Sequence, residues 1–139
     1  MKVMVIVKAN EQSEAGILPD TGLFAKMTKY NEELVNAGVM LEGDGLQPSS
    51  KGKRVKFSGE QPIVTDGPFA ETKELIAGFW LWNVASIDEA VEWLKRAPFG
   101  GGAEVEIRPF YTPEDLGSKL TPELKERNKR LREEAAKRK

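Results

Sequence analysis

The chain contains no cysteine and no histidine among its 139 residues, and these two absences exclude most common catalytic groups. Without thiols it can form no disulfide, thiolate zinc site, iron–sulfur cluster or cysteine nucleophile. Without imidazoles it can form no Ser-His-Asp triad, His-ligated metal site or His general base. Proton transfer is left to carboxylates, Lys, Tyr and Arg. Because no Asp-x-Asp-x-Asp-Gly loop is present either, we expect no metal and no cofactor.

Long hydrophobic runs are also missing. No apolar stretch approaches the roughly 18 residues that span a membrane, and the N-terminal run 2–7 lacks the cleavage site of a signal peptide. The hydrophobic fraction of 40% and charged fraction of 31% are those of a soluble globular domain. We therefore expect a cytoplasmic protein without a membrane partner.

Charge is distributed unevenly along the chain. The net charge is −1, but residues 123–139 hold eight Lys or Arg against four Glu, so residues 1–122 carry −5. A basic tail is one signature of nucleic-acid binding. Here the glutamates are interleaved with the cations at helical spacing, which favours a solvated helix with i,i+4 pairs and disfavours a nucleic-acid partner.

Hydrophobic periodicity predicts alternating strands and helices. Strands are expected at 2–7, 39–42, 76–84 and 103–108, a hairpin at 53–57 and 62–65, and helices at 23–35 and 86–97. Ser86-Ile87-Asp88-Glu89 has the pattern of a capping box, and Thr121-Pro122 marks the start of a charged C-terminal helix. A polar loop is expected between the first strand and the first helix.

The predicted fold class is α+β. Two β-α-β units with an inserted hairpin give a ferredoxin-like β-α-β-β-α-β sheet with both helices on one face, followed by the charged helix. The first and third core strands are apolar on both faces, so the second face must bury against something. A second copy of the chain is the simplest cover, and we expect a homodimer.

The most informative stretch is the charged turn 65–74, directly before the most apolar strand. Asp66 can accept hydrogen bonds from amides of its own turn, and Pro68 restricts Gly67. One interpretation is a turn with exposed charges. The other is a ligand site, in which a carboxylate in a partly apolar cleft takes a raised pKa and acts as a base.

The residues Asp66-Gly67-Pro68-Phe69, with Glu71, Lys73 and Glu74 after them, resemble the signature of the DGPF proteins in the YCII-related family. The resemblance runs from residue 1 to about 110 and includes the glycine turn 43–46. It implies a dimeric ferredoxin-like α+β barrel and an activity that is mostly unassigned. Some relatives are encoded beside extracytoplasmic-function sigma factors, which implies a sigma-factor system as a partner. The His-Asp pair proposed for other branches cannot exist here.

Two functional hypotheses follow. In the first, an enzyme or degenerate enzyme acts on a small molecule in a cleft near the DGPF loop, with Asp66 as the catalytic residue. Four further residues would bind the ligand: Asp44, Glu71, Lys73 and Trp80. Trp80 is equally consistent with core packing. In the second hypothesis, the chain is a binding or regulatory module without catalysis. Residues 1–110 would form the YCII-related domain and 111–139 the helical extension.

Overall fold

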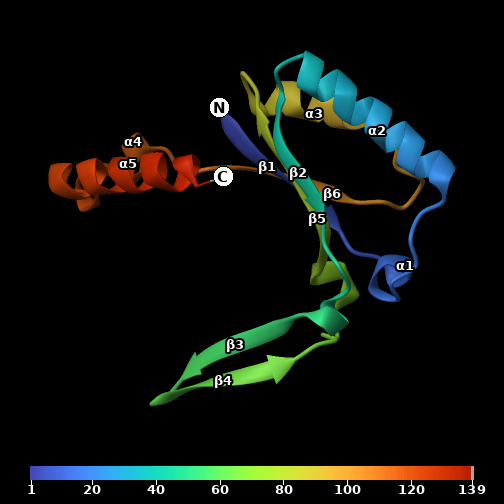
Figure 1. The fold of residues 1–139 in the computed structure, drawn as a ribbon, viewed down its shortest axis with the longest axis horizontal. Coiled ribbons are helices and arrows are strands. Elements are labelled where there is room, and N and C mark those ends of the chain that lie inside the picture. Colours follow the sequence, from blue (N-terminus) through green and yellow to red (C-terminus); the bar gives the residue numbers. More distant parts are fainter. Residues whose placement is uncertain (139) are drawn as a thin grey trace. The chain divides into compact units, whose positions relative to one another are not determined.

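The computed structural model describes residues 1–138, and the side chain of Lys73 lies outside that description. The chain forms two compact units, Met1–Pro109 and Phe110–Lys139. Within the described residues, no helix combines the length and the apolar character needed to cross a membrane. Strands and helices alternate in the first unit and helices make up the second (Figure 1), so the chain is an α+β protein.

The first unit contains six strands and three α-helices. Its elements are β1 (Lys2–Lys8), α1 (Glu11–Glu14), α2 (Thr21–Asn36), β2 (Met40–Gly45), η1 (Ser49–Lys51), β3 (Lys53–Ser58), β4 (Gln61–Asp66), η2 (Thr72–Glu74), β5 (Ile76–Asn83), α3 (Ile87–Lys95) and β6 (Val105–Pro109). Periodicity placed the core strands and both long helices within a few residues. It missed α1, because this helix carries no apolar stripe and is instead held by the Asn10 cap, whose side chain accepts from the Ser13 N–H.

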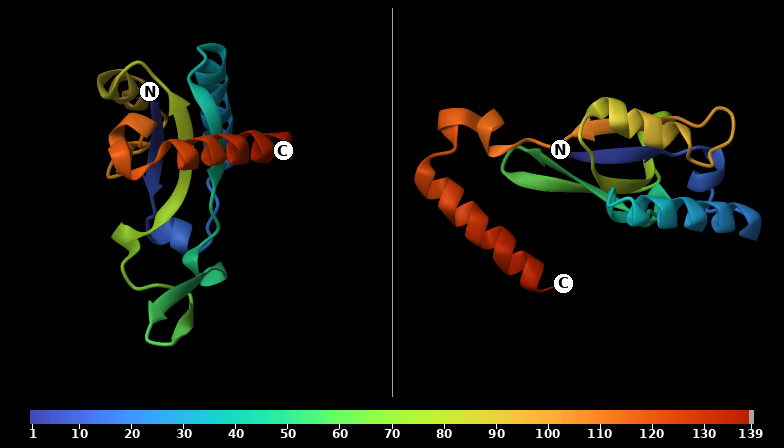
Figure 2. Two further views of the ribbon diagram at one scale, coloured as in Figure 1. Left: turned by 90° about the vertical axis from the view of Figure 1, so that its left-hand side faces the viewer. Right: turned by 90° about the horizontal axis from the view of Figure 1, so that it is seen from above.

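Four strands form one sheet in the order β2-β5-β1-β6, with every neighbouring pair antiparallel. The hairpin β3–β4 is a separate two-stranded sheet. The inserted hairpin is present where the sequence predicts it, and it stands clear of the main sheet (Figure 2, left). Strands β3 and β4 pair with each other from Lys53↔Asp66 to Ser58↔Gln61.

Helices α2 and α3 lie on the same side of the four-stranded sheet (Figure 1). The core forms between them and the sheet face that carries Val3, Val5, Trp80 and Trp82, all at most 5% exposed. The helices contribute further buried residues, namely Tyr30, Leu34 and Ala90. Burying large aromatic side chains supplies most of the stabilisation of such a core.

Helix ends follow the sequence signals. Ser86 caps α3, because its side-chain oxygen accepts from the Glu89 N–H at 3.1 Å. The Glu89 carboxylate accepts from the Ala85 N–H, whereas a capping box would have it accept from the Ser86 N–H. Gly38, with a φ of +74°, follows α2 in the left-handed region that favours glycine.

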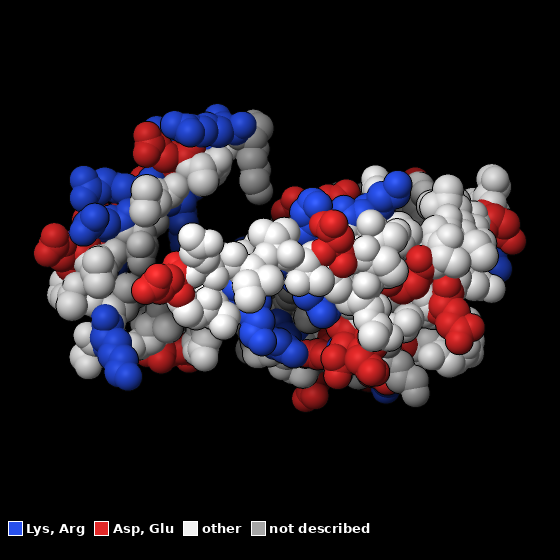
Figure 3. All heavy atoms as spheres, turned by 90° about the horizontal axis from the view of Figure 1, so that it is seen from below, with Lys and Arg blue, Asp and Glu red and all other residues white. Residues whose placement is uncertain are grey.

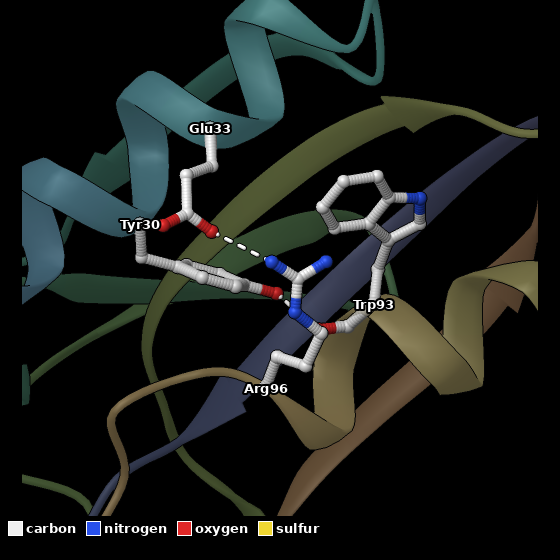
Figure 4. A network of polar contacts seen from close by, with 4 residues as sticks. All are labelled: Tyr30, Glu33, Trp93 and Arg96. Carbon is white, nitrogen blue, oxygen red and sulfur yellow. Dashed lines mark hydrogen bonds and ion pairs between the residues drawn. The ribbon is translucent and has the colours of Figure 1, made fainter.

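The two helices are joined by a polar contact at their facing surfaces (Figure 4). The Tyr30 hydroxyl on α2 donates to the Trp93 carbonyl oxygen on α3 at 2.6 Å. Beside it, the Arg96 guanidinium pairs with Glu33 at 2.8 Å and lies 4.8 Å from the centre of the Trp93 ring. Burial raises the pKa of Tyr30 to about 12.

The second unit consists of α4 (Pro113–Leu116), η3 (Gly117–Lys119) and α5 (Pro122–Lys137). Thr121 caps α5 and Pro122 occupies its first turn, as the sequence predicts. No residue of α5 that the structure describes is buried, and Leu131 is 62% exposed. This helix therefore gains little from packing within the second unit.

Candidate functional site

The DGPF loop begins at an exposed end of the hairpin. Asp66 is the last residue of β4 and pairs in register with Lys53 on β3. Their side chains form an ion pair at 2.5 Å and are 75% and 66% exposed, respectively. A pair this open to solvent contributes little to stability. Asp66 thus closes the hairpin through a surface contact.

Gly67 lies against the backbone of η1. Its N–H donates to the Gly52 carbonyl oxygen at 3.0 Å, and a Cβ at this position would lie 1.8 Å from the Ser49 carbonyl oxygen. No side chain fits at that distance, so this position requires glycine for steric reasons. The following Gly67–Pro68 peptide bond is cis.

Phe69 links the loop to α1 through Ser49. The Phe69 N–H donates to the Ser49 hydroxyl oxygen at 3.1 Å, and that hydroxyl donates to the Glu14 carboxylate. The same carboxylate accepts from the Ser49 N–H at 2.9 Å. These bonds from Ser49 lower the pKa of Glu14. Arg54 covers the Phe69 ring at 3.9 Å. The DGPF loop, η1 and α1 therefore form one connected structural element.

The other residues expected to bind a ligand are dispersed. Asp44 is exposed on β2 and pairs in register with Phe79, whereas Gly43 pairs with Trp80. Because side chains alternate along a strand, Asp44 and Trp80 lie on opposite faces of the sheet. The Trp80 indole N–H donates to the Asn31 side chain on α2 at 2.9 Å, which places its ring in the core.

Glu71 is exposed just before η2, and its carbonyl oxygen accepts from the Glu74 N–H. The expected role of Lys73 concerns a side chain outside the described part of the chain. The structure thus does not bring Asp66, Asp44 and Trp80 together around one site.

A cavity of about 850 Å³ lies elsewhere, between the end of β1, the first half of α2 and the loop before β6. Its apolar wall comes from Leu23, Phe24 and Met27 on α2 and from Phe99. The described residues that line this cavity include none of the predicted ligand residues Asp66, Asp44, Glu71 and Trp80. The volume lies within the range of about 300–1,000 Å³ that is usual for small-molecule sites.

Polar groups at the cavity come from α1 and its cap Asn10, from a glycine loop, and from two charged residues, Lys8 at the end of β1 and Glu104 before β6. Gln12 and Ser13 lie on its α1 side, and Gly100, Gly101 and Gly102 form the opposite rim. Glycines leave backbone amides accessible to a ligand because no side chain shields them. The arrangement suits a molecule with an apolar body and a few hydrogen-bonding groups.

The sequence patterns place these residues in elements but do not predict the cavity. Leu23, Phe24 and Met27 belong to the predicted helix 23–35, and residues 100–102 lie between the predicted helix 86–97 and the predicted strand 103–108. Only the fold brings positions about 75 residues apart to the same cavity. Among the described residues, no group of three or more carboxylates is placed to hold a metal ion. Metal independence stays a prediction.

The known proteins similar to this chain include one curated relative and one solved structure. An uncharacterized protein of Rhizobium meliloti (strain 1021) is 33% identical over 103 residues, which cover 71% of this chain and 83% of that protein. A solved structure, 5-chloro-2-hydroxyhydroquinone dehydrochlorinase (TftG) from Burkholderia phenoliruptrix AC1100 in complex with 2,5-dihydroxybenzoquinone, is 17% identical with a TM-score of 0.40. That match covers 83% of this chain and 99% of the other. It is too distant to transfer chemistry.

The family assignment rests on the sequence of the first unit. The family model for the YCII-related domain matches residues 1–111, which include all six strands and the DGPF loop. With this match, the chain belongs to the YCII-related family.

Proposed function

We propose that this protein is a homodimer that binds a small, largely apolar molecule in the cavity between β1, α2 and the 100–102 loop. The observation that carries the binding function is the cavity itself, with an apolar wall on one side and accessible polar groups on the other. The sequence has no thiol and no imidazole, so any reaction of the bound molecule would depend on other side chains.

The fold supports the finer assignment to the ferredoxin-like type. The order β2-β5-β1-β6, with helices α2 and α3 in the two crossover connections, is the arrangement that two interleaved β-α-β units produce. The homodimer is supported by the sheet face opposite these helices, which carries Phe79 and Leu81. A symmetric second copy would remove this apolar surface from water.

In this proposal the DGPF loop does not line the cavity but holds α1, which forms part of the cavity wall. Helix α1 directs Gln12 and Ser13 toward the cavity, while its Glu14 is held by Ser49. Ser49 in turn accepts from the Phe69 N–H. The motif therefore supports the ligand site through α1, and a role for Asp66 in contact with the ligand is not part of the proposal.

The proposal is tested with a fluorescent dye, 8-anilinonaphthalene-1-sulfonate, which carries an apolar body and one anionic group. Wild-type protein should bind one dye per chain with saturation. Leu23→Trp places a larger side chain at the cavity wall and should weaken binding at least tenfold. Val35→Trp is the matched control, because it adds the same side chain to the same helix at a position that does not line the cavity.

Competition by benzoate and by benzyl alcohol then compares an anionic with a neutral ligand of similar shape. A preference for one of them identifies the charge that the site accepts. If Leu23→Trp binds the dye as tightly as Val35→Trp does, the cavity is not the binding site and the proposed binding function is wrong.

A further inference from the structure

The cavity next to α2 has a row of hydrogen-bond donors on its glycine rim, residues 100–102. None of the three N–H groups of this run donates a hydrogen bond to another residue that the structure describes. Because glycine has no side chain, nothing shields these N–H groups from a molecule in the cavity. The rim therefore favours a ligand that presents a hydrogen-bond acceptor.

The glycine rim is a tight turn with a defined conformation. The Gly100 carbonyl oxygen accepts from the Ala103 N–H at 3.3 Å, Gly102 has a φ of +86°, and the φ of Gly101 is not positive. These are the features of a type II turn, in which the internal hydrogen bond joins the first and fourth residues. The N–H of Gly101, the second residue, thus has no acceptor within the turn.

The hydroxyl group on the opposite side of the cavity is already committed. The Ser13 hydroxyl oxygen accepts from the Asn10 N–H at 2.9 Å, and the hydroxyl donates to the Asn10 carbonyl oxygen at 3.0 Å. Both bonds belong to the cap of α1. Recognition of a polar ligand group is therefore assigned to the glycine rim.

Charge at the cavity disfavours an anionic ligand. Lys8 Nζ is paired with the Glu106 carboxylate at 3.4 Å, whereas Glu104 is an exposed carboxylate without a cation beside it among the described residues. On the face of the first unit that Figure 3 shows, the two signs are interspersed with uncharged surface, so no large positive field would attract an anion. The acceptor that suits these donors is therefore an uncharged oxygen.

Two phenylalanine rings line the same cavity from different elements. Phe24 lies on α2 and is 49% exposed, and Phe99 lies in the segment between α3 and β6. The Phe99 ring packs edge-on against Trp80, with 6.1 Å between the ring centres, and this contact holds it in place. Aromatic side chains bind ring-shaped ligands through stacked or edge-to-face contacts. The apolar part of the ligand is therefore expected to be a ring.

We propose that the cavity selects an uncharged aromatic carbonyl compound, such as a ketone, aldehyde, amide or ester. Its ring contacts Phe24 and Phe99, and its carbonyl oxygen accepts from the Gly101 N–H. The inference rests on the small-molecule binding of the proposed function and adds the chemical class of the ligand and the group that recognises it.

Four compounds of similar size test this class in NMR titrations of the full chain. Acetophenone has both the ring and the carbonyl group, ethylbenzene lacks the carbonyl, cyclohexyl methyl ketone lacks the aromatic ring, and benzoate is an anion. Wild type should bind acetophenone at least about threefold more tightly than each of the other three, which is the gain that one hydrogen bond or one ring contact provides.

Two substitutions at Gly101 test the donor. Gly101→Pro removes the N–H and suits the second position of this turn, and Gly101→Ala keeps the N–H in a place where an added Cβ has no atom within 4 Å. Gly101→Pro should bind acetophenone at least about threefold more weakly than Gly101→Ala does. The two variants should bind ethylbenzene equally, because it offers no acceptor.

Amide NMR spectra of wild type give a second measurement that needs no variant at the rim. Acetophenone should move the Gly101 amide proton downfield relative to ethylbenzene at equal saturation, since both compounds exert a similar ring-current effect. Phe24→Leu should reduce the preference for acetophenone over cyclohexyl methyl ketone. Phe57→Leu, a change on the exposed hairpin that does not line the cavity, is the matched control and should leave that preference unchanged.

The results distinguish this inference from the proposed function. If neither the fluorescent dye nor any of the four compounds binds, the proposed binding function is wrong and the inference is wrong with it. If the compounds bind without a preference for acetophenone, the inference alone is wrong. The inference is also overturned if Gly101→Pro and Gly101→Ala bind acetophenone equally, or if benzoate binds more tightly than acetophenone.

Discussion

At the scale of single residues, the four positions of the DGPF motif differ in what they contribute. Asp66 is a surface residue paired with Lys53, whereas Gly67 lies where any side chain would collide with the backbone of Ser49. Phe69 anchors the loop by a backbone bond to Ser49 and by its ring under Arg54. Within the motif, the steric constraint is thus strongest at Gly67, although Asp66 is the residue whose side chain could act as an acid or base.

Gly67→Ala should therefore destabilise the fold while Asp66→Asn should not. The added methyl group forces the loop away from η1, and overpacking of this kind costs about 1–3 kcal/mol. Asp66→Asn loses only an exposed ion pair, worth about 0.2–1 kcal/mol. Urea denaturation of the two variants measures both effects. A larger loss for Asp66→Asn than for Gly67→Ala would show that the carboxylate has a role that its exposed ion pair does not explain.

At the scale of elements, the contact between α2 and α3 includes one buried hydroxyl. Tyr30 is 4% exposed, and its hydroxyl donates to the Trp93 carbonyl oxygen in the last turn of α3. The same carbonyl oxygen also accepts from the Arg96 N–H at 3.1 Å, so Tyr30 adds a second hydrogen bond to an acceptor at the end of α3. Burial favours the neutral phenol and raises its pKa from the usual 10 to about 12.

This raised pKa predicts a loss of stability in alkali. Because the folded state holds the Tyr30 proton more tightly than the unfolded state does, the stabilisation is complete below pH 10 and is lost as pH rises through about 12. Tyr30→Phe should cost about 1 kcal/mol at pH 7 and should lose less stability than wild type between pH 10 and 12. In a Tyr111→Phe background Tyr30 is the single tyrosine, so absorbance at 295 nm follows its titration directly. A midpoint near 10 would contradict the buried position.

The sequence predicted elements better than it predicted their assembly. Alternation and helical spacing are local properties, so they located β1, β5, α2 and α3. The short helix α1 escaped because its stability comes from the Asn10 cap and not from an apolar stripe. The sequence did not predict the cavity because its walls come from segments far apart in the sequence. The ligand roles of the residues around the DGPF loop stay predictions.

At the scale of the whole molecule, the two units depend on packing to very different degrees. The core residues and those packed against them all lie between Val3 and Ile107. Among the described residues of α5, none is buried, and its apolar stripe is limited to positions such as Leu124 and Leu131. Solvated helices of this kind rely on capping and charge pairs, which contribute a few tenths of a kcal/mol each. We therefore expect the first unit to fold without the second.

A chain that ends at residue 111 should keep the fold and the dimer of the full protein. It loses only residues outside the core, and the sheet face proposed to form the dimer lies within Met1–Pro109. We expect a melting temperature within about 4 °C of the full chain, which corresponds to less than about 1 kcal/mol for a domain of this size. Calorimetry and sedimentation of the two proteins at matched concentration provide the comparison. If the shortened chain aggregates or dissociates, the C-terminal unit covers apolar surface that we assign to the second copy, and the homodimer must be rebuilt around α5.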